Sequence, residues 1–212
     1  SLQCFTGVAM RRFAACLTAV WMLLLSACQH APEPLPSNMI AIADGITLQL
    51  TLPEKNFTAT QKITARYRNP QRDSSSTQET QHTLLMQVQA SPQNIVLAGL
   101  APSGTRLFSL QFDGNTTEVW KSPLFSLQQI NSNTFDARYA LADFELTAFE
   151  HNALQRALSP DALLIDTVKN GVRKRELQRR NGETIIHIEY RATQTEYCHR
   201  ERHYCLLIEN LP

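Results

Sequence analysis

Short runs of alternating apolar and polar residues follow one another between residues 57 and 121, and turn-forming residues separate them. A period of two predicts β-strands that bury one face. The runs are FTATQKITARY, HTLLMQVQA, NIVLAGL, TRLFSLQF and TTEVW. Because alternate side chains of a strand point to the same side, two runs collect large apolar groups on one face: Leu84, Met86 and Val88 in the second, and Phe108, Leu110 and Phe112 in the fourth. We expect about five strands here, joined as a meander.

The pattern changes between residues 123 and 159, a stretch without glycine. Apolar residues recur there at close to helical spacing: Leu141, Phe144, Ala148, Leu154 and Leu158. Pro160 then ends the run, because proline cannot continue a helix. We predict one or two helices in this stretch.

About four more strands are predicted after the helical stretch, from the runs ALLIDTV, VRKRELQRR, TIIHIEY and YCLLIEN. The pairs Asn170-Gly171 and Asn181-Gly182 separate the first three runs, and such pairs favour type I′ hairpin turns, whose central residues need positive φ. Strands, then helices, then strands predict an α+β domain: an antiparallel curved sheet with the helices covering one face.

The charged run VRKRELQRR, residues 172–180, has almost no apolar face. We interpret it as an exposed or edge strand, where charge prevents sheets from associating. The alternative is a basic stripe that binds phosphate-bearing headgroups. The nearly neutral charge of the chain favours the first interpretation.

The beginning of the chain has the features of an exported lipoprotein. Arg11 and Arg12 precede an apolar run over residues 13–25, which is too short to span a bilayer comfortably and is typical of a signal peptide. The following Leu-Ser-Ala-Cys28 resembles the bacterial lipobox, in which the cysteine receives a lipid and becomes the mature N-terminus. That resemblance implies a signal peptide over residues 1–27, lipidation of Cys28 and, because Gln29 rather than Asp follows, the outer membrane.

Three domain segments follow from this interpretation. Residues 1–9 precede the leader's own Met10 and are not expected to belong to it. Residues 28–53 are expected to form the lipidated N-terminus and an extended, proline-containing tether. Residues 54–212 are expected to form one domain, which is large enough to bury a core.

The charge of the chain argues against a nucleic-acid partner. The sequence has 20 Lys and Arg residues and 19 Asp and Glu residues, and the predicted leader contains two of the basic ones. The rest of the chain is therefore close to neutral and lacks the basic excess of a nucleic-acid-binding domain.

No catalytic motif is recognisable, and we expect no enzyme activity, no cofactor and no metal site. The sequence contains no Gly-x-Ser-x-Gly, His-Glu-x-x-His, Cys-x-x-Cys or phosphate loop. Asp143 and Glu145 on the predicted helix face different ways, so we interpret them, with Glu150, as a solvated face rather than a paired acid and base.

The order of elements behind a lipobox resembles the LolA/LolB family of periplasmic lipoprotein carriers and receptors. The segment LAGLAPSGTRLFSLQFDGNTTEVW is similar to a strand–turn–strand–turn region of LolB. Most of residues 48–191 also resembles an uncharacterised lipoprotein family often encoded in aryl polyene gene clusters, through FTATQKITARY, LAPSGTRLFSLQFDG, LADFELTAFEHNALQRAL and RNGETIIHIEY. The resemblance implies an incomplete β-barrel whose helices cover an apolar cavity.

The apolar stripes alone fit a filled core as well as a cavity. The resemblance favours a cavity, and implies a ligand site lined by these residues: Leu84, Met86, Val88, Phe108, Leu110, Phe112, Trp120 and Phe144. We therefore expect an outer-membrane lipoprotein that binds a lipid or lipidated cargo. The alternative is a structural or assembly lipoprotein that binds a protein partner of the envelope.

Cys198 and Cys205 bracket a stretch that also contains His199 and His203. A zinc site, a disulfide and two free thiols are the three alternatives. Export favours oxidation, and cysteines on paired strands can meet the Cα separation that a disulfide needs. Adjacent residues of a strand point to opposite sides, so Cys198 and His199 would not converge on one metal ion.

We predict a structural disulfide between Cys198 and Cys205 across a C-terminal hairpin. Tyr197 and Tyr204 would flank the bridge. Residues 199–203 would form an exposed tip.

Overall fold

The structure is a computed structural model that describes residues 35–67, 80–124 and 138–212. The chain divides into two units, Ser1–Leu35 and Pro36–Pro212. The second unit contains all of the described helices and strands.

Ten strands of this unit form one antiparallel sheet, in the order β7-β6-β5-β4-β3-β12-β11-β10-β9-β8. Their bounds are β3 Phe57–Tyr67, β4 Thr80–Ala90, β5 Ile95–Leu100, β6 Arg106–Phe112, β7 Thr117–Lys121, β8 Ala162–Lys169, β9 Val172–Arg179, β10 Thr184–Tyr190, β11 Gln194–His199 and β12 Tyr204–Leu211. The sheet is not closed, because β7 and β8 are its two edges. The predicted α+β class with an antiparallel sheet is confirmed, with five strands rather than four after the helices.

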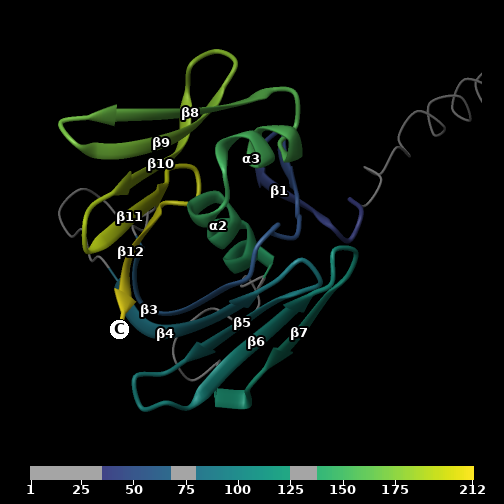
Figure 1. The fold of residues 1–212 in the computed structure, drawn as a ribbon, viewed down its shortest axis with the longest axis vertical. Coiled ribbons are helices and arrows are strands. Elements are labelled where there is room, and N and C mark those ends of the chain that lie inside the picture. Colours follow the sequence, from purple (N-terminus) through teal and green to yellow (C-terminus); the bar gives the residue numbers. More distant parts are fainter. Residues whose placement is uncertain (1–34, 68–79, 125–137) are drawn as a thin grey trace, which may run out of the picture. The chain divides into compact units, whose positions relative to one another are not determined.

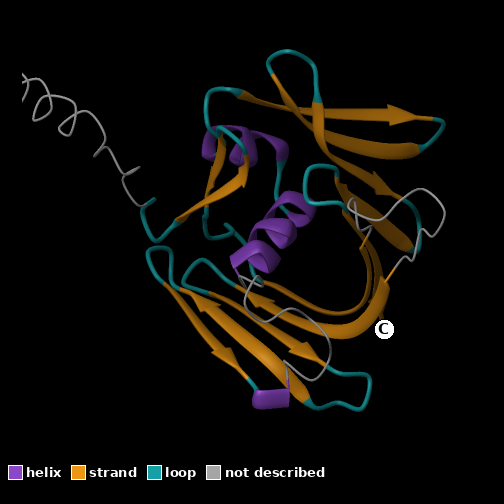
Figure 2. Ribbon diagram, turned by 180° about the vertical axis from the view of Figure 1, so that it is seen from behind, coloured by secondary structure: helices purple, strands orange, loops and turns teal. Residues whose placement is uncertain are grey.

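The sheet curves around helix α2 (Arg138–Ala148), which lies on its concave side (Figures 1 and 2). The register of the strands sets which side chains face α2. Buried apolar side chains gather on this concave face: Met86, Val88, Leu97, Phe108, Leu110, Phe112, Ile186 and Ile188. The convex face carries ion pairs instead, such as Lys62–Glu209 and Lys174–Glu189, both at 2.9 Å. One apolar and one polar face are what an antiparallel sheet needs when one side meets water.

A separate two-stranded hairpin, β1 (Met39–Ala43) and β2 (Ile46–Gln49), completes the core. Four of its apolar residues are at most 3% exposed: Ile40, Ile42, Ile46 and Leu48. The expectation that residues 28–53 form a tether is therefore wrong from about Pro36 onward. The segment IAIADGITLQL alternates on both sides of an Asp-Gly turn, and burial of these residues commits it to the folded unit.

The predicted helical stretch contains two helices within the described residues, α2 and α3 (His151–Ala157). They are separate because Glu150 is extended, with φ −66° and ψ 146°. From α3, the side chain of Gln155 accepts from the Leu164 N–H at 2.8 Å and donates to the Ala162 carbonyl at 3.2 Å. These bonds occupy backbone groups of edge strand β8 that no neighbouring strand pairs.

Strand β9, the charged run, is not an edge strand, because it pairs with β8 on one side and β10 on the other. The interpretation as an exposed or edge strand is wrong in a second respect, since Arg175 is 0% exposed and Leu177 only 1%. Of the turns beside β9, Asn170-Gly171 has both φ values positive, at 53° and 75°, as a type I′ turn requires. In the Asn181-Gly182 turn only the glycine has positive φ, so that turn is of another type.

Gly99 on β5 provides space for the aromatic ring of Phe108, its partner on β6. A Cβ atom at residue 99 would lie 2.2 Å from the Phe108 Cε1 atom. The fully buried Phe108 ring therefore depends on the missing side chain.

We predict that Gly99→Ala lowers the free energy of unfolding by about 1–3 kcal/mol, as overpacking of a core does. Denaturant unfolding measures the loss. In a Phe108→Leu background the same substitution should cost clearly less, because the ring is gone. An equal cost in both backgrounds would show that the contact with Phe108 is not the cause.

Candidate functional site

The apolar stripes predict a ligand site on the concave face of the sheet. Most of the predicted ligand-binding side chains there are buried by other parts of the chain. Val88, Phe108, Leu110 and Phe112 are at most 2% exposed. Met86 is 6% exposed and Phe144, on α2, is 8% exposed. A side chain so enclosed packs against other side chains, and these residues belong to one core cluster.

Part of the concave face remains partly exposed along the central strands β3, β4 and β12. We call it the central strip and define it as Phe57, Tyr67, Leu84, Tyr204 and Leu206. Phe57 and Tyr67, on β3, are 39% and 40% exposed, and the other three are partly buried against the core. Of the predicted ligand-binding residues, Leu84 alone lies in the central strip. The strip includes four residues that the sequence analysis did not assign to the ligand site.

Trp120 lies elsewhere. It pairs with Ser109 on β6, whereas Phe108 and Leu110 point to the other face. Its side chain is 47% exposed, and the guanidinium of Arg106 lies 4.9 Å from its ring centroid. The grouping of Trp120 with the β6 stripe is therefore wrong: alternation places it on the convex face.

Arg175 fixes the C-terminal end of α2 from the sheet. Its Nη1 donates to the carbonyl oxygens of Leu146 at 2.8 Å and Phe149 at 2.9 Å. Its Nε and Nη2 donate to the two carboxylate oxygens of Asp166, at 2.8 and 2.9 Å. Burial raises the pKa of Asp166, but hydrogen bonds from Arg175 and Arg173 outweigh it and lower that pKa to about 2. The last carbonyl groups of a helix lack hydrogen-bond donors within it. Here the buried guanidinium of Arg175 supplies the donors.

Asp143 fixes the middle of α2 to strands β11 and β12. The hydroxyl of Tyr197 donates to Asp143 Oδ1, and the hydroxyl of Tyr204 donates to both carboxylate oxygens at 2.9 and 2.8 Å. Burial raises the pKa of Asp143 to about 6, although both hydroxyls and Arg202 act to lower it. A further tyrosine on β10, Tyr190, donates to the Thr147 carbonyl at 2.9 Å.

Glu145 fixes α2 to the chain that follows β2. It is 0% exposed and accepts from the Thr51 N–H at 3.1 and 3.2 Å. Burial raises the pKa of Glu145 to about 8, against the opposing effect of the bonds from Thr51. The interpretation of Asp143 and Glu145 as a solvated face is wrong, because α2 lies inside the curved sheet and has polar partners there.

His199 and Arg202 fasten the β1–β2 hairpin to the turn between β11 and β12. His199 Nε2 donates to the Ile42 carbonyl at 3.1 Å, and Arg202 Nη2 donates to the Ala41 carbonyl at 2.9 Å. The Arg202 guanidinium also lies 3.2 Å from the ring centroid of Tyr139 on α2. His199 is 2% exposed, and burial lowers its pKa to about 4, so it is neutral at pH 7. The sequence analysis expected His199 to lie in an exposed tip, and that prediction is wrong.

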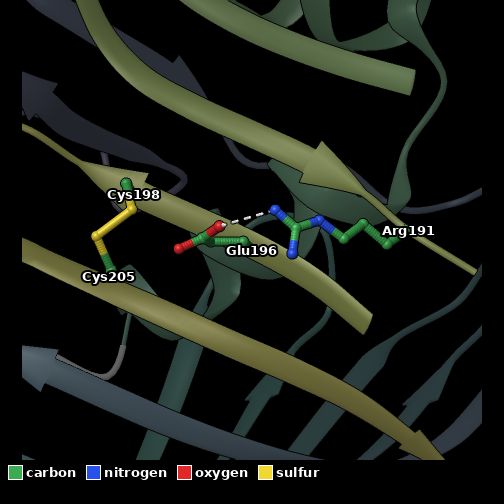
Figure 3. The surroundings of a disulfide bond; sticks show 4 residues. All are labelled: Arg191, Glu196, Cys198 and Cys205. Atoms are coloured by element: carbon green, nitrogen blue, oxygen red, sulfur yellow. Dashed lines mark ion pairs between the residues drawn. A yellow bond between two sulfur atoms is a disulfide. The ribbon is translucent and has the colours of Figure 1, made fainter. Parts of the chain in front are cut away.

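Cys198 and Cys205 lie directly opposite each other on β11 and β12 and form a disulfide, with 4.1 Å between their Cα atoms (Figure 3). Both point to the convex face, beside Glu196 and Arg191, whose charged groups are 3.8 Å apart. Tyr197 and Tyr204 point to the concave face instead. Among the described residues, no group of three or more His, Cys, Asp or Glu side chains could hold a metal ion.

The polar residues around α2 carried no sequence signal of their own. Asp143 is 54 positions from Tyr197 and 61 from Tyr204, and no motif connects it to them. The one available indication was Arg175, an arginine on the same face of its run as Leu177. The pairing of β9 with β8 was needed to show that this face is buried.

Comparison with protein families identifies the chain. The family described as a protein of unknown function, DUF3261, matches residues 58–212, and the chain belongs to this family. The match covers the ten-stranded sheet from the second residue of β3 onward, together with both described helices, and excludes the β1–β2 hairpin. No curated protein matches the chain in sequence.

We predict that Arg175→Met lowers the free energy of unfolding by about 3–5 kcal/mol, because it removes the buried partner of the Asp166 carboxylate and leaves two carbonyls at the end of α2 unpaired. Denaturant unfolding measures this. Arg173→Met is the matched control, since Arg173 also binds Asp166, at 2.9 Å, but its side chain is 44% exposed. The control should cost about 0–1 kcal/mol. Similar losses in the two variants would contradict the role given to Arg175.

A second prediction concerns pH. The pKa of Glu145 is about 8 in the folded chain, compared with 4.5 for an unperturbed glutamate side chain. The folded state therefore binds the Glu145 proton more tightly, and this stabilisation is complete below about pH 4.5 and lost as the pH rises through 8. The difference in stability between wild type and Glu145→Gln should shift in favour of the variant between pH 5 and 8, by up to about 1.4 kcal/mol per pH unit.

Denaturant unfolding of both proteins at several pH values measures this difference. Other titrating groups, such as His199, contribute to both proteins and cancel in the comparison. A difference that does not change with pH would show that Glu145 is not held protonated by burial.

Proposed function

We propose that this member of the DUF3261 family is an outer-membrane-anchored lipoprotein that binds a long apolar ligand, a lipid or lipidated cargo, along the central strip. The observation that carries the proposal is the partial exposure of Phe57, Tyr67, Leu84, Tyr204 and Leu206 on the concave face, where the large apolar side chains of β6 are buried. Concave, partly open apolar surface is where proteins bind ligands of this kind. The open curved sheet with a helix inside it supports a fold like that of LolA and LolB.

The dimensions of the strip suit such a ligand. Phe57 and Tyr67 are ten residues apart on β3, which is about 34 Å along an antiparallel strand. The hydrocarbon core of a bilayer, two acyl chains end to end, is about 30 Å thick. A single acyl chain is therefore shorter than the distance between the two ends of the strip, which the buried Ile63 and Ala65 separate on β3. Each methylene that such a chain removes from water contributes about 0.8 kcal/mol.

Membrane attachment in this proposal depends on Cys28 and the lipobox-like segment before it. A lipid on Cys28 holds the folded unit at the membrane through the chain between Cys28 and Pro36. Gln29 directs the lipoprotein to the outer membrane. None of the described helices is long and apolar enough to cross a bilayer.

A protein partner of the envelope is a second candidate, favoured by the edge strand β8. Leu163 and Val168 on β8 are 47% and 72% exposed, and edge strands offer unpaired backbone groups to other chains. Crosslinking in cells distinguishes the two candidates: a dominant protein adduct without bound lipid favours the partner.

We expect Leu84→Gln to weaken binding of a fluorescent fatty acid by about fivefold, because about 1 kcal/mol of apolar contact is lost. Titration of the purified protein measures the affinity, and native mass spectrometry shows co-purified lipid. Leu85→Gln is the matched control: Leu85 is the next residue on β4, is also partly buried and points to the convex face.

The control should bind like wild type. Equal affinities for Leu84→Gln and wild type would argue against the central strip as the binding surface. A wild-type protein that neither carries lipid nor binds the probe would argue against the function as a whole.

A further inference from the structure

Trp120 stands out among the exposed apolar residues because of its setting. It lies near the end of edge strand β7, is 47% exposed and has the Arg106 guanidinium over its ring at 4.9 Å. A large aromatic side chain exposed to this degree does not contribute fully to the core. Its polar N–H and apolar ring, next to a cation, are the combination found at membrane–water interfaces.

A neighbouring residue extends this surface. Leu124 is 46% exposed. The Ser122 N–H donates to the Leu107 carbonyl at 2.8 Å, and the Leu124 N–H donates to Ser122 Oγ at 3.2 Å. These bonds hold Leu124 beside the start of β6, where Arg106 lies. We call Arg106, Trp120 and Leu124 the β7 corner; Figure 1 shows this end of β7 at the margin of the folded unit.

The chain enters the folded unit on the same hairpin. Ser37 Oγ donates to the Asn115 carbonyl at 2.7 Å, and Asn115 lies in the turn between β6 and β7. Cys28 and Ser37 are nine residues apart, so a fully extended chain between them reaches about 32 Å at most. A lipid on Cys28 therefore keeps the β6–β7 hairpin within that distance of the membrane. Trp120 is five residues from Asn115, or about 17 Å along the strand.

We propose that the β7 corner rests in the phosphate-bearing headgroup layer of the membrane that carries the lipid anchor, with Trp120 inserted and Arg106 near the lipid phosphates. This inference rests on the proposed anchoring at Cys28 and adds the orientation of the domain. The exposed apolar side chains leave water there, and a cation at an anionic surface contributes about 1 kcal/mol. The opposite edge of the sheet, β8, then faces away from the bilayer.

The sequence provides its own reporter for a test. The chain has two tryptophans, Trp21 in the predicted leader and Trp120. In a Trp21→Phe background all tryptophan fluorescence comes from residue 120. The lipidated protein is purified and reconstituted into vesicles of phosphatidylethanolamine and phosphatidylglycerol, with and without brominated acyl chains. Flotation with the vesicles reports the anchor independently of the fluorescence.

In the floated vesicles we expect Trp120 to emit at shorter wavelength and to be quenched by the brominated lipids. Acrylamide should quench it at least about twofold less than in soluble protein that lacks the lipid. The matched control moves the reporter to the other edge by Trp21→Phe, Trp120→Phe and Leu163→Trp, since Leu163 is also 47% exposed. This reporter should remain open to acrylamide and insensitive to bromine.

Two results overturn the inference while leaving the anchor intact: a floated protein whose Trp120 is as open to acrylamide as in solution, or equal protection of both reporters. A protein that does not float overturns the anchoring and, with it, the orientation. Protection of Trp120 alone in the floated protein supports the inference.

Discussion

Helix α2 ends inside the molecule, and the rest of the fold depends on how its last carbonyl groups are satisfied. The carbonyl of Leu146 is buried and that of Phe149 is partly buried, and an unpaired buried carbonyl costs about 1–3 kcal/mol. Arg175 satisfies both and is itself neutralised by Asp166. Because Arg175 must reach the end of α2 from β9, the sheet has to curve until β9 lies beside the helix. The position of α2 therefore requires the charged side chain of Arg175 on β9, an interior strand of the sheet.

The two halves of the sheet hold α2 by different means. Strands β9 to β12 each supply a polar group to it: Arg175, Tyr190, Tyr197 and Tyr204. Strands β3 to β6 face the interior mainly with apolar side chains, such as Val88 and Phe108. The polar bonds are directional and fix the helix against one half. Contacts of the other half are nondirectional. Where the two halves meet, along β3, β4 and β12, apolar surface is partly exposed. That asymmetry is the physical basis for placing a ligand in the central strip.

The alternation of β3 to β6 was enough to predict those strands, because each buries one face against the same interior. Together with the helical spacing after residue 123, it predicted the order of elements and the antiparallel α+β class, whereas the open sheet was implied by the resemblance alone. The β1–β2 hairpin was missed because prolines before it suggested a tether, and its burial depends on contacts with residues more than 100 positions away, such as Leu158 and His199. Asp143 and Glu145 were misjudged for a related reason. Their spacing describes the helix surface, but only the curved sheet shows that both sides of that surface are enclosed.

The family model begins at Thr58 and therefore spans the strands that hold α2 and the whole central strip except Phe57. It leaves out the β1–β2 hairpin, which closes one end of the interior. Our account therefore places the ligand surface in the part of the fold that defines the family. The β1–β2 hairpin packs over the core, and hydrogen bonds from His199 and Arg202 hold it there. The disulfide between Cys198 and Cys205 ties together the two strands that carry Tyr197 and Tyr204, from the opposite face of the sheet.

The most direct test of the central claim is paramagnetic broadening of leucine methyl signals by a spin-labelled fatty acid in NMR spectra of the purified protein. Leu84 and Leu206 point to the concave face, and their sequence neighbours Leu85 and Leu207 point to the convex face. The account predicts strong broadening at Leu84 and Leu206 and little at Leu85 and Leu207. Broadening confined to Leu85 and Leu207, or none at any of the four, would contradict it.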